Sequence, residues 1–256
     1  MYPPDHKMYR EKSRQLMEYL RTFTKEIEQV SVDECYMNFT PIMGRYHSPV
    51  DGAAEIKDGI KERFGFTVNI GISTNKLLAK MASDFEKPDR IHTLFPEEIR
   101  EKMWPLPIGD LYMAGRSSVE TLKKLEINTI GDLAGTDPDL IALHLKSHGR
   151  MLWEFANGRG AEVVQAEPEE AKGIGNSTTL KEDISDMKEV RPVFEELADS
   201  VGNRLKKAGK KAGMVSAEIK YYDFRTISHQ IQLDRPSNDP AVLSETACAL
   251  FLEVWS

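Results

Sequence analysis

Two adjacent carboxylates, Asp33 and Glu34, have the most readily identified chemistry in this sequence. They stand in Ser31-Val32-Asp33-Glu34-Cys35-Tyr36, between two segments that read as strands. Neighbouring side chains of a strand point to opposite faces, but at a hairpin turn both carboxylates can face one site. Hard oxygen donors suit Mg²⁺, which keeps waters and completes its shell with substrate phosphates. The pair therefore indicates a two-metal phosphoryl-transfer site, and an ordinary solvated acidic turn is the alternative.

A second candidate site contains lysines that follow a short apolar segment. Gly71-Ile72-Ser73-Thr74-Asn75-Lys76 reads as a strand running into a helix start, and Lys80 and Lys87-Pro88 come soon after. A helix start binds anions through its free N–H groups, and nearby lysines can neutralise a triphosphate. The Gly-Lys-Ser/Thr order of a Walker loop is missing. We expect Lys80 and Lys87 to bind a nucleotide, and a capped core helix with solvated lysines is the alternative.

Residues 106–133 read as short helices joined by a glycine-containing hairpin. The start of the second helix, near Gly115, Arg116 and Ser117, is expected to be exposed. Backbone N–H groups at such a start can contact a DNA phosphate without reading sequence. The alternative is a helical hairpin with no ligand.

A basic stretch covers residues 204–225. It holds seven basic residues and two acidic ones, a local balance of +5, and Tyr221, Tyr222 and Phe224 stand among them. A basic surface that carries aromatic rings can follow a nucleic-acid backbone. A solvated helix end beside a sheet is the alternative.

The composition limits the class of protein. The chain has 256 residues, 40% hydrophobic and 29% charged, with a net charge of -7, which suits one or two folded domains. No apolar run approaches the roughly 18 residues of a membrane span, so no membrane partner is expected. The N-terminus lacks the apolar core of a secretory signal, and Cys35 and Cys248 cannot form a disulfide framework, which predicts a cytoplasmic protein. The acidic total argues against a simple nucleic-acid-coating protein.

Apolar periodicity predicts the elements that must position these residues. Before Pro96 we expect an α+β arrangement with a hairpin turn at the acidic pair, a helix ended by Gly65 and a helix capped by Asn75. The predicted ranges are helix 8–23, strands 27–32 and 35–40, helix 56–64, strand 66–72 and helix 76–87.

The rest of the chain is predicted to form a helical segment and a second α/β segment. Helices are expected at 97–104, 117–125, 130–134 and 138–145. Residues 161–170, with four glutamates and a proline, read as a linker. Beyond the linker we expect strand 175–180, helix 190–208, strands 214–222 and 226–233, and helix 240–255.

In this order the motifs resemble those of the Y-family translesion DNA polymerases, which include DNA polymerase IV and UmuC-like proteins. Residues 31–36 are similar to the family's S-[IV]-D-E-[AC]-[YF] motif, and residues 71–80 to its G-[IV]-[SA]-x-N-K-x-x-A-K segment. Lys87-Pro88 stands where the family has its Lys-Pro. Residues 174–176 and 222–226 are similar to landmarks of its little-finger domain.

The resemblance implies an α+β fold in three domains. These are a ferredoxin-like palm over residues 1–94, a small all-helical thumb with a helix-hairpin-helix over 95–160, and a little finger over 172–256, with a linker at 161–171. The little finger would have the order β-α-β-β-α, without its closing strand. The family begins with an apolar strand that carries a third metal-binding Asp, and it also has a fingers domain. The resemblance implies that both are missing here. Asp5 is a poor substitute for that Asp.

The resemblance also implies roles for individual residues. Asp33 and Glu34 would be the catalytic residues that bind two Mg²⁺ ions, and Lys87, beside Lys80, would contact the triphosphate. DNA would be bound by Gly115, Arg116, Ser117, Lys220, Arg225 and Thr226. The expected partners are primer-template DNA and deoxynucleoside triphosphates, with a sliding clamp reached through a tail that would follow Ser256.

The function implied is template-directed DNA synthesis past damaged bases by a DNA-directed DNA polymerase. Since two carboxylates cannot hold two metals as three can, we expect this chain to be an incomplete catalytic core. The alternative is a non-catalytic DNA-binding truncation of such a polymerase. A helix-hairpin-helix nuclease is disfavoured, because no further acid or histidine clusters near Asp33 in the sequence.

Overall fold

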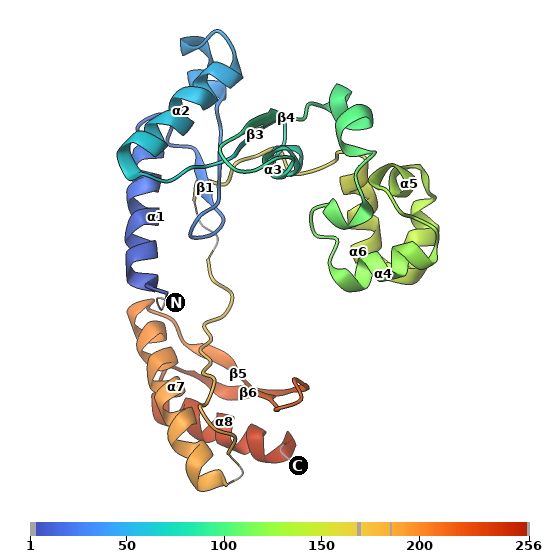
Figure 1. The fold of residues 1–256 in the computed structure, drawn as a ribbon. Coiled ribbons are helices and arrows are strands. Elements are labelled where there is room, and N and C mark those ends of the chain that lie inside the picture. The colour runs from blue at the N-terminus through green and yellow to red at the C-terminus, as the bar shows by residue number, and fades with distance from the viewer. Residues whose placement is uncertain (1–3, 168–169, 185, 255–256) are drawn as a thin grey trace. The chain divides into compact units, whose positions relative to one another are not determined.

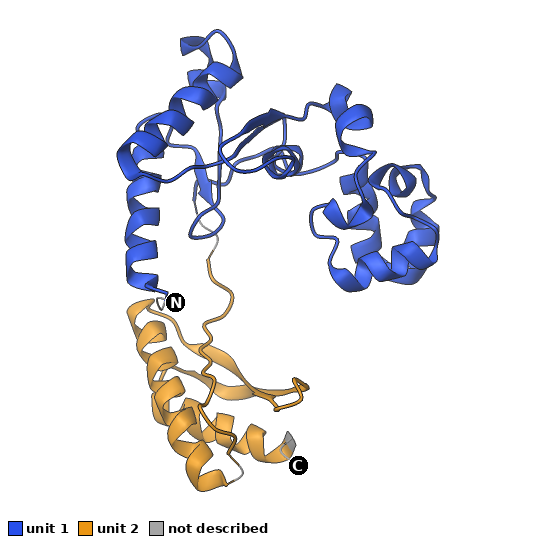
Figure 2. Cartoon of the chain, in the orientation of Figure 1, with its two compact units in different colours: residues 1–168 blue, residues 169–256 orange. Residues whose placement is uncertain are grey.

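The computed structural model describes residues 4–167, 170–184 and 186–254, and the chain divides into two compact units (Figure 1). Unit 1 covers residues 1–168 and unit 2 covers residues 169–256 (Figure 2). The boundary lies inside the predicted linker, while the finer division into three domains stays a prediction. Within the described residues, no helix combines the length and the apolar character needed to cross a membrane.

The first part of unit 1 contains both helices and strands, as predicted, and we call residues 4–94 the α/β part. Asn75 caps α3, and Gly65 ends α2 in the left-handed conformation with φ of 74°. The elements are α1 (His6–Leu20), β1 (Ile27–Gln29), β2 (Cys35–Met37), α2 (Pro49–Phe64), β3 (Ile70–Ile72), α3 (Lys76–Asp84) and β4 (Ile91–Thr93).

The strands of the α/β part form two separate pairs. β1 and β2 are antiparallel, with Ile27 opposite Met37, and the hairpin prediction is confirmed. β3 pairs in parallel with β4, a strand that the periodicity did not indicate. In the described residues each of these sheets has two strands, so the ferredoxin-like palm stays a prediction. β1, β2 and β3 are all shorter than predicted.

Residues 95–157, which we call the helical part, are helical as predicted. The elements are η2 (Pro96–Glu98), η3 (Ile99–Met103), η4 (Ile108–Asp110), α4 (Arg116–Lys124), α5 (Ile130–Gly135) and α6 (Pro138–Ala156). α6 continues beyond its predicted end at 145, through a kink at Lys146, where φ is 54°.

One apolar core joins the helical part to α3. Leu77, Leu78 and Met81 of α3 are buried in the same cluster as Met103 and Ile108. A second cluster lies between α1, α2 and the first hairpin, and includes Met17, Ile27 and Ile56. α3 therefore belongs to the α/β part by sequence and to the core of the helical part by packing.

Unit 2 consists, in its described residues, of two helices and a long hairpin. The elements are α7 (Met187–Lys207), β5 (Ala212–Lys220), β6 (Thr226–Ser237) and α8 (Pro240–Val254). β5 and β6 are antiparallel, with Lys220 opposite Thr226 beside the turn. Leu205 of α7 and Leu243 of α8 are buried in one cluster with Ala198.

The predicted strand at 175–180 is wrong. These residues are exposed coil, and Arg204 of α7 donates to the carbonyl oxygen of Gly175 over 2.7 Å. A strand is stable only when a neighbour satisfies its backbone N–H and C=O groups, and neither β5 nor β6 pairs with this segment. The order β-α-β-β-α is therefore replaced by α-β-β-α in the described residues.

Candidate active site

Asp33 and Glu34 lie at the turn between β1 and β2, and both are exposed. The turn is closed by Val30 N–H and Ser31 N–H, which donate to the carbonyl oxygen of Glu34 over 2.9 and 3.2 Å. The Ser31 hydroxyl donates to Asp33 Oδ1 over 2.7 Å and accepts from Glu34 N–H over 3.1 Å. Ser31, which begins the motif, thus fixes the turn on which the acidic pair stands.

Lys80 of α3 contacts this turn, although 46 residues separate it from Glu34. Its Nζ lies 2.5 Å from Glu34 Oε1 and 3.4 Å from Asp84 Oδ2. Lys87 Nζ lies 2.6 Å from the other oxygen of Asp84. Glu34, Lys80, Asp84 and Lys87 therefore form a row of alternating charges, which we call the charge row, and it joins both predicted sites.

The charge row shifts the pKa of its inner members. Partial burial alone would lower the pKa of Lys80, but the hydrogen bond to Glu34 and the charge of Asp84 raise it overall. Partial burial would likewise raise the pKa of Asp84, yet the hydrogen bond from Lys87 and the charge of Lys80 lower it. Both groups are therefore charged at neutral pH.

Asp84 is a site residue that the motif analysis missed. It stands four residues after Lys80 and three before Lys87, spacings at which side chains meet on a helical turn. That spacing was the available signal, and it could have placed Asp84 between the two lysines.

The donor atoms at the turn suit Mg²⁺ but are few. Two exposed carboxylates leave most coordination positions to water and phosphate oxygens, a donor set that Mg²⁺ accepts. Among the described residues, no three or more His, Cys, Asp or Glu side chains gather where they could hold a metal. Asp5 caps α1 instead, since its Oδ1 accepts from Lys7 N–H and Met8 N–H over 3.0 and 2.9 Å.

The start of α3 is not open to an anion, contrary to the expectation of free N–H groups there. Asn75 Oδ1 accepts from Leu78 N–H, and the carbonyl oxygen of Ala161 accepts from Lys76 N–H, both over 2.9 Å. Asn75 Nδ2 also donates to the carbonyl oxygen of Gly158 over 2.9 Å. The chain following α6 covers this helix start, so a phosphate would have to be held by lysine side chains.

Cys35, beside the acidic pair, has the character of a packed side chain. It is partly buried against the core of α1, α2 and the first hairpin. Burial raises the pKa of its thiol to about 11. Because the thiolate is the nucleophilic form, the environment of Cys35 does not favour nucleophilic catalysis.

The predicted DNA contacts of the helical part lie at the start of α4. Gly115 is the N-cap and supplies no side-chain acceptor, and the Arg116 side chain is 93% exposed beside Glu120, 2.9 Å away. Just before it, Met113 has φ of 67°, a conformation that favours glycine. Met113 therefore holds a backbone conformation that glycine would adopt at lower cost.

The predicted DNA contacts of unit 2 gather at the tip of the β5–β6 hairpin. Lys220 and Thr226 are paired in register, and Arg225 follows the turn between them. Asp223 holds Arg225, because its Oδ1 accepts from Arg225 N–H over 3.1 Å and its Oδ2 lies 2.5 Å from Arg225 Nε. The structure thus brings these three predicted residues together within unit 2.

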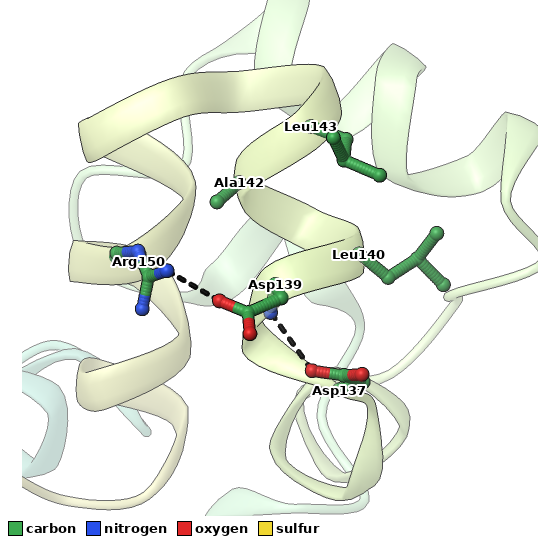
Figure 3. A pocket seen from close by; sticks show the side chains of 6 residues that line it. All are labelled: Asp137, Asp139, Leu140, Ala142, Leu143 and Arg150. Carbon is green, nitrogen blue, oxygen red and sulfur yellow. Dashed lines mark hydrogen bonds and ion pairs between the residues drawn. The ribbon is translucent and has the colours of Figure 1, made fainter.

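Two hollows on the surface lie away from the predicted site residues. One, of about 570 Å³, lies along α6 on both sides of its kink and is lined by Asp137, Asp139, Leu140, Ala142, Leu143 and Arg150 (Figure 3). The other, of about 320 Å³, lies between α7 and α8 and is lined by Arg191, Glu195 and Ser244, among others. Neither is lined by a residue of the charge row.

The chain is similar to known proteins over its whole length. Its residues 1–84 match the model of the impB/mucB/samB family, and residues 171–256 match the model of that family's C-terminal domain. It is 42% identical over 255 residues to the DNA polymerase IV of Clostridium acetobutylicum, covering 100% of this chain and 64% of that protein. The chain thus spans less than two thirds of the length of this relative.

Solved structures share the fold. A Y-family DNA polymerase chimera matches with a TM-score of 0.85 and 23% identity, over 98% of this chain and 72% of that one. An insertion ternary complex of Dbh DNA polymerase matches with a TM-score of 0.60 and 24% identity, over 98% of this chain and 72% of that one. The chain therefore belongs to the impB/mucB/samB family, whose two models match residues 1–84 and 171–256.

Proposed function

We propose that this chain is the part of a translesion polymerase that binds the metal, nucleotide and DNA for template-directed synthesis past damaged bases. The observation that supports this most is the contact of Lys80 with Glu34, since it joins two motifs far apart in sequence. In this proposal residues 1–94 are a ferredoxin-like palm, residues 95–160 a thumb with a helix-hairpin-helix, and residues 172–256 a little finger after a linker at 161–171.

The reaction would be attack of a primer 3′-hydroxyl on the α-phosphate of a deoxynucleoside triphosphate, with loss of pyrophosphate. Asp33 and Glu34 would hold Mg²⁺ with waters and nucleotide phosphates, as their donor atoms allow. When bound, Mg²⁺ would supply activation of the hydroxyl and stabilisation of the leaving pyrophosphate.

The lysines of the charge row would bind the triphosphate. Lys87 is 59% exposed and pairs with Asp84, whose single charge is weaker than that of a polyphosphate. It can therefore exchange Asp84 for the nucleotide at little cost. Lys80, only 19% exposed, would stay beside the acidic pair and keep the site from accumulating negative charge as the nucleotide enters.

DNA would be held through its backbone at two surfaces. These are the start of α4 with Gly115, Arg116 and Ser117, and the β5–β6 tip with Lys220, Arg225 and Thr226. Contacts of this kind position DNA without reading its sequence, which suits an enzyme that must accept any template.

Primer extension with Mg²⁺ on undamaged and abasic templates tests the proposal. As an incomplete catalytic core, the chain is expected to extend the primer slowly, and Asp33→Asn to reduce that rate at least about a hundredfold without changing DNA affinity. Asp58→Asn is the matched control, because Asp58 is an exposed acid of α2 that pairs with Lys57, 2.8 Å away. Equal extension by the chain and Asp33→Asn would refute the proposed role of the acidic pair.

A non-catalytic DNA-binding protein is the second candidate, favoured by the lack of a third metal-ligating side chain at the turn within the described residues. It predicts no extension, together with DNA binding that weakens steeply with salt and is indifferent to Asp33→Asn. Binding that does not respond to salt would count against both functions.

A further inference from the structure

The turn of the β5–β6 hairpin has an unusual conformation at Phe224. Phe224 N–H donates to the carbonyl oxygen of Tyr221, and Tyr221 N–H donates to that of Arg225, both over 2.9 Å. Phe224 has φ of 65°, in the left-handed region. In turns of this length that position normally holds glycine, because a side chain there is strained.

Packing does not account for the choice of phenylalanine. The Phe224 residue is 77% exposed and Tyr222, two positions before it, is 79% exposed. Two large rings thus stand in solvent at one turn, and one of them occupies a strained position that glycine would fill at lower cost. Strain that folding does not require is characteristic of functional positions.

The surroundings of the two rings are cationic. Lys220 Nζ lies 4.9 Å from the centre of the Phe224 ring, and the Arg225 guanidinium lies 5.7 Å from that of Tyr221. Five further basic residues, Arg204, Lys206, Lys207, Lys210 and Lys211, precede β5, at the end of the hairpin remote from this turn. Exposed rings for bases and cations for phosphates are the combination that binds single-stranded nucleic acid.

Asp223 keeps the tip in order between the rings. Because the Arg225 backbone N–H and guanidinium both donate to Asp223, the pKa of this carboxyl is lowered and it stays ionised. The turn is thereby fixed before any ligand arrives, which reduces the ordering cost of binding.

We propose that Tyr222 and Phe224 form a stacking platform for unpaired bases of single-stranded DNA. This rests on the proposed DNA-binding function and adds to it, since phosphate contacts serve duplex and single strand alike, whereas stacking on these rings requires a base that is not paired. The ligand class is therefore an unpaired stretch of DNA, such as a single-stranded template.

The test compares a fluorescent oligo-dT with a blunt duplex of equal length, by anisotropy, for the full chain and for Tyr222→Ser with Phe224→Gly. We expect the double variant to lose about five- to a hundredfold in affinity for oligo-dT per stacked base, with the duplex affinity unchanged within about twofold. Phe224→Trp should retain binding of oligo-dT. Tyr9→Ser is the control, because Tyr9 is an exposed aromatic residue of α1.

The outcomes separate the two proposals. Equal losses for oligo-dT and duplex, or no loss for either, would overturn stacking while leaving the proposed DNA-binding function intact. Failure of the unaltered chain to bind any DNA would overturn both. Misfolding is checked by the thermal midpoint, which we expect to be unchanged or higher in the double variant, since Phe224→Gly removes strain.

Discussion

Lys80 provides a positive charge at a place where a metal ion would also bring one. Its ammonium lies against Glu34, so any divalent cation that binds this carboxylate has to displace or tolerate Lys80. The affinity of the acidic pair for metal in the absence of nucleotide is therefore set partly by a side chain that does not ligate.

We expect Lys80→Met to tighten metal binding, since it removes a competing cation from Glu34. The gain for a partly exposed ion pair is about fivefold in the dissociation constant of Mn²⁺, measured by titration without nucleotide. Lys87→Met is the control, because Lys87 pairs with Asp84 and not with Glu34. An unchanged constant in Lys80→Met would mean that Lys80 does not compete with metal.

Met113 allows a second prediction at this scale. Its φ of 67° costs a non-glycine residue free energy, and the residue is 53% exposed, so little packing is lost on truncation. Met113→Gly should raise the free energy of unfolding by about 0.5–1 kcal/mol in urea denaturation. Met113→Ala keeps the strain and should not stabilise, and a gain as large as that of glycine would refute the explanation.

At the scale of elements, the contact of β3 with α3 positions Lys80. Gly71 of β3 lies so close to α3 that an added Cβ would be 1.8 Å from the carbonyl oxygen of Ala79. This oxygen belongs to the backbone and cannot move aside, so Gly71, which begins the segment 71–80, has a packing role.

Gly71→Ala should therefore destabilise unit 1 by about 3 kcal/mol, measured by urea denaturation. Gly44→Ala is the matched control, because a Cβ at Gly44 has no neighbour within 4 Å, and its effect should stay within about 0.5 kcal/mol. A similarly small effect of Gly71→Ala would contradict the packing described.

The chain after α6 is tied back to β1 through Glu28. This carboxylate accepts from Lys76 Nζ and from Gln165 N–H, both over 2.8 Å. Partial burial alone would raise the pKa of Glu28, but these two hydrogen bonds and the charge of Lys76 lower it below the ordinary value of 4.5.

The folded state lowers the pKa of Glu28, so this carboxylate stabilises the fold at pH values above its ordinary pKa. The stabilisation is lost as the pH falls through the lowered pKa of the folded state. The urea midpoint of Glu28→Gln should therefore fall less between about pH 7 and about pH 3 than that of the unaltered chain. Parallel curves for the two proteins would show that Glu28 does not contribute.

Local signals in the sequence were sufficient for most elements. Gly65 after α2 and the alternation around Asp33 depend on neighbours only, and both elements formed, although α2 begins at Pro49 and not at residue 56. β4 was missed because three residues carry no period and its partner β3 lies about twenty residues earlier. The strand at 175–180 was wrong for the converse reason, since alternation cannot supply a partner.

In the candidate site, too, local features could be predicted from the sequence and long-range contacts could not. The acidic pair and the lysines were found from residue type, but the Lys80–Glu34 contact depends on how α3 packs beside the first hairpin. The covering of the α3 start by Ala161 was equally invisible, because the carbonyl comes from a residue 85 positions later with no motif of its own.

At the scale of the whole molecule, each unit has its own apolar core. Leu205 is buried among residues of unit 2, whereas the largest cluster is confined to unit 1. Net charge is likewise uneven, since the chain total of -7 coexists with +5 over residues 204–225. Stability and DNA affinity should therefore be separable between the units.

Leu205→Ala should destabilise unit 2 by about 3 kcal/mol through the cavity it leaves. Hydrogen exchange followed by mass spectrometry should show faster exchange in α7, β5 and α8 and unchanged exchange in α1–α6. Ala208→Gly, just after α7, is a milder comparison. Faster exchange in both units would show that they unfold together.

The state of the two cysteines has a consequence for labelling. Cys35, with its thiol pKa of about 11, is almost entirely protonated at the pH of maleimide coupling, and Cys248 is 3% exposed. A cysteine introduced at an exposed position, such as Thr226→Cys in unit 2, would therefore react far faster than either native thiol. Fluorophores can thus be attached to one chosen position without first removing Cys35 from the core that supports the acidic turn.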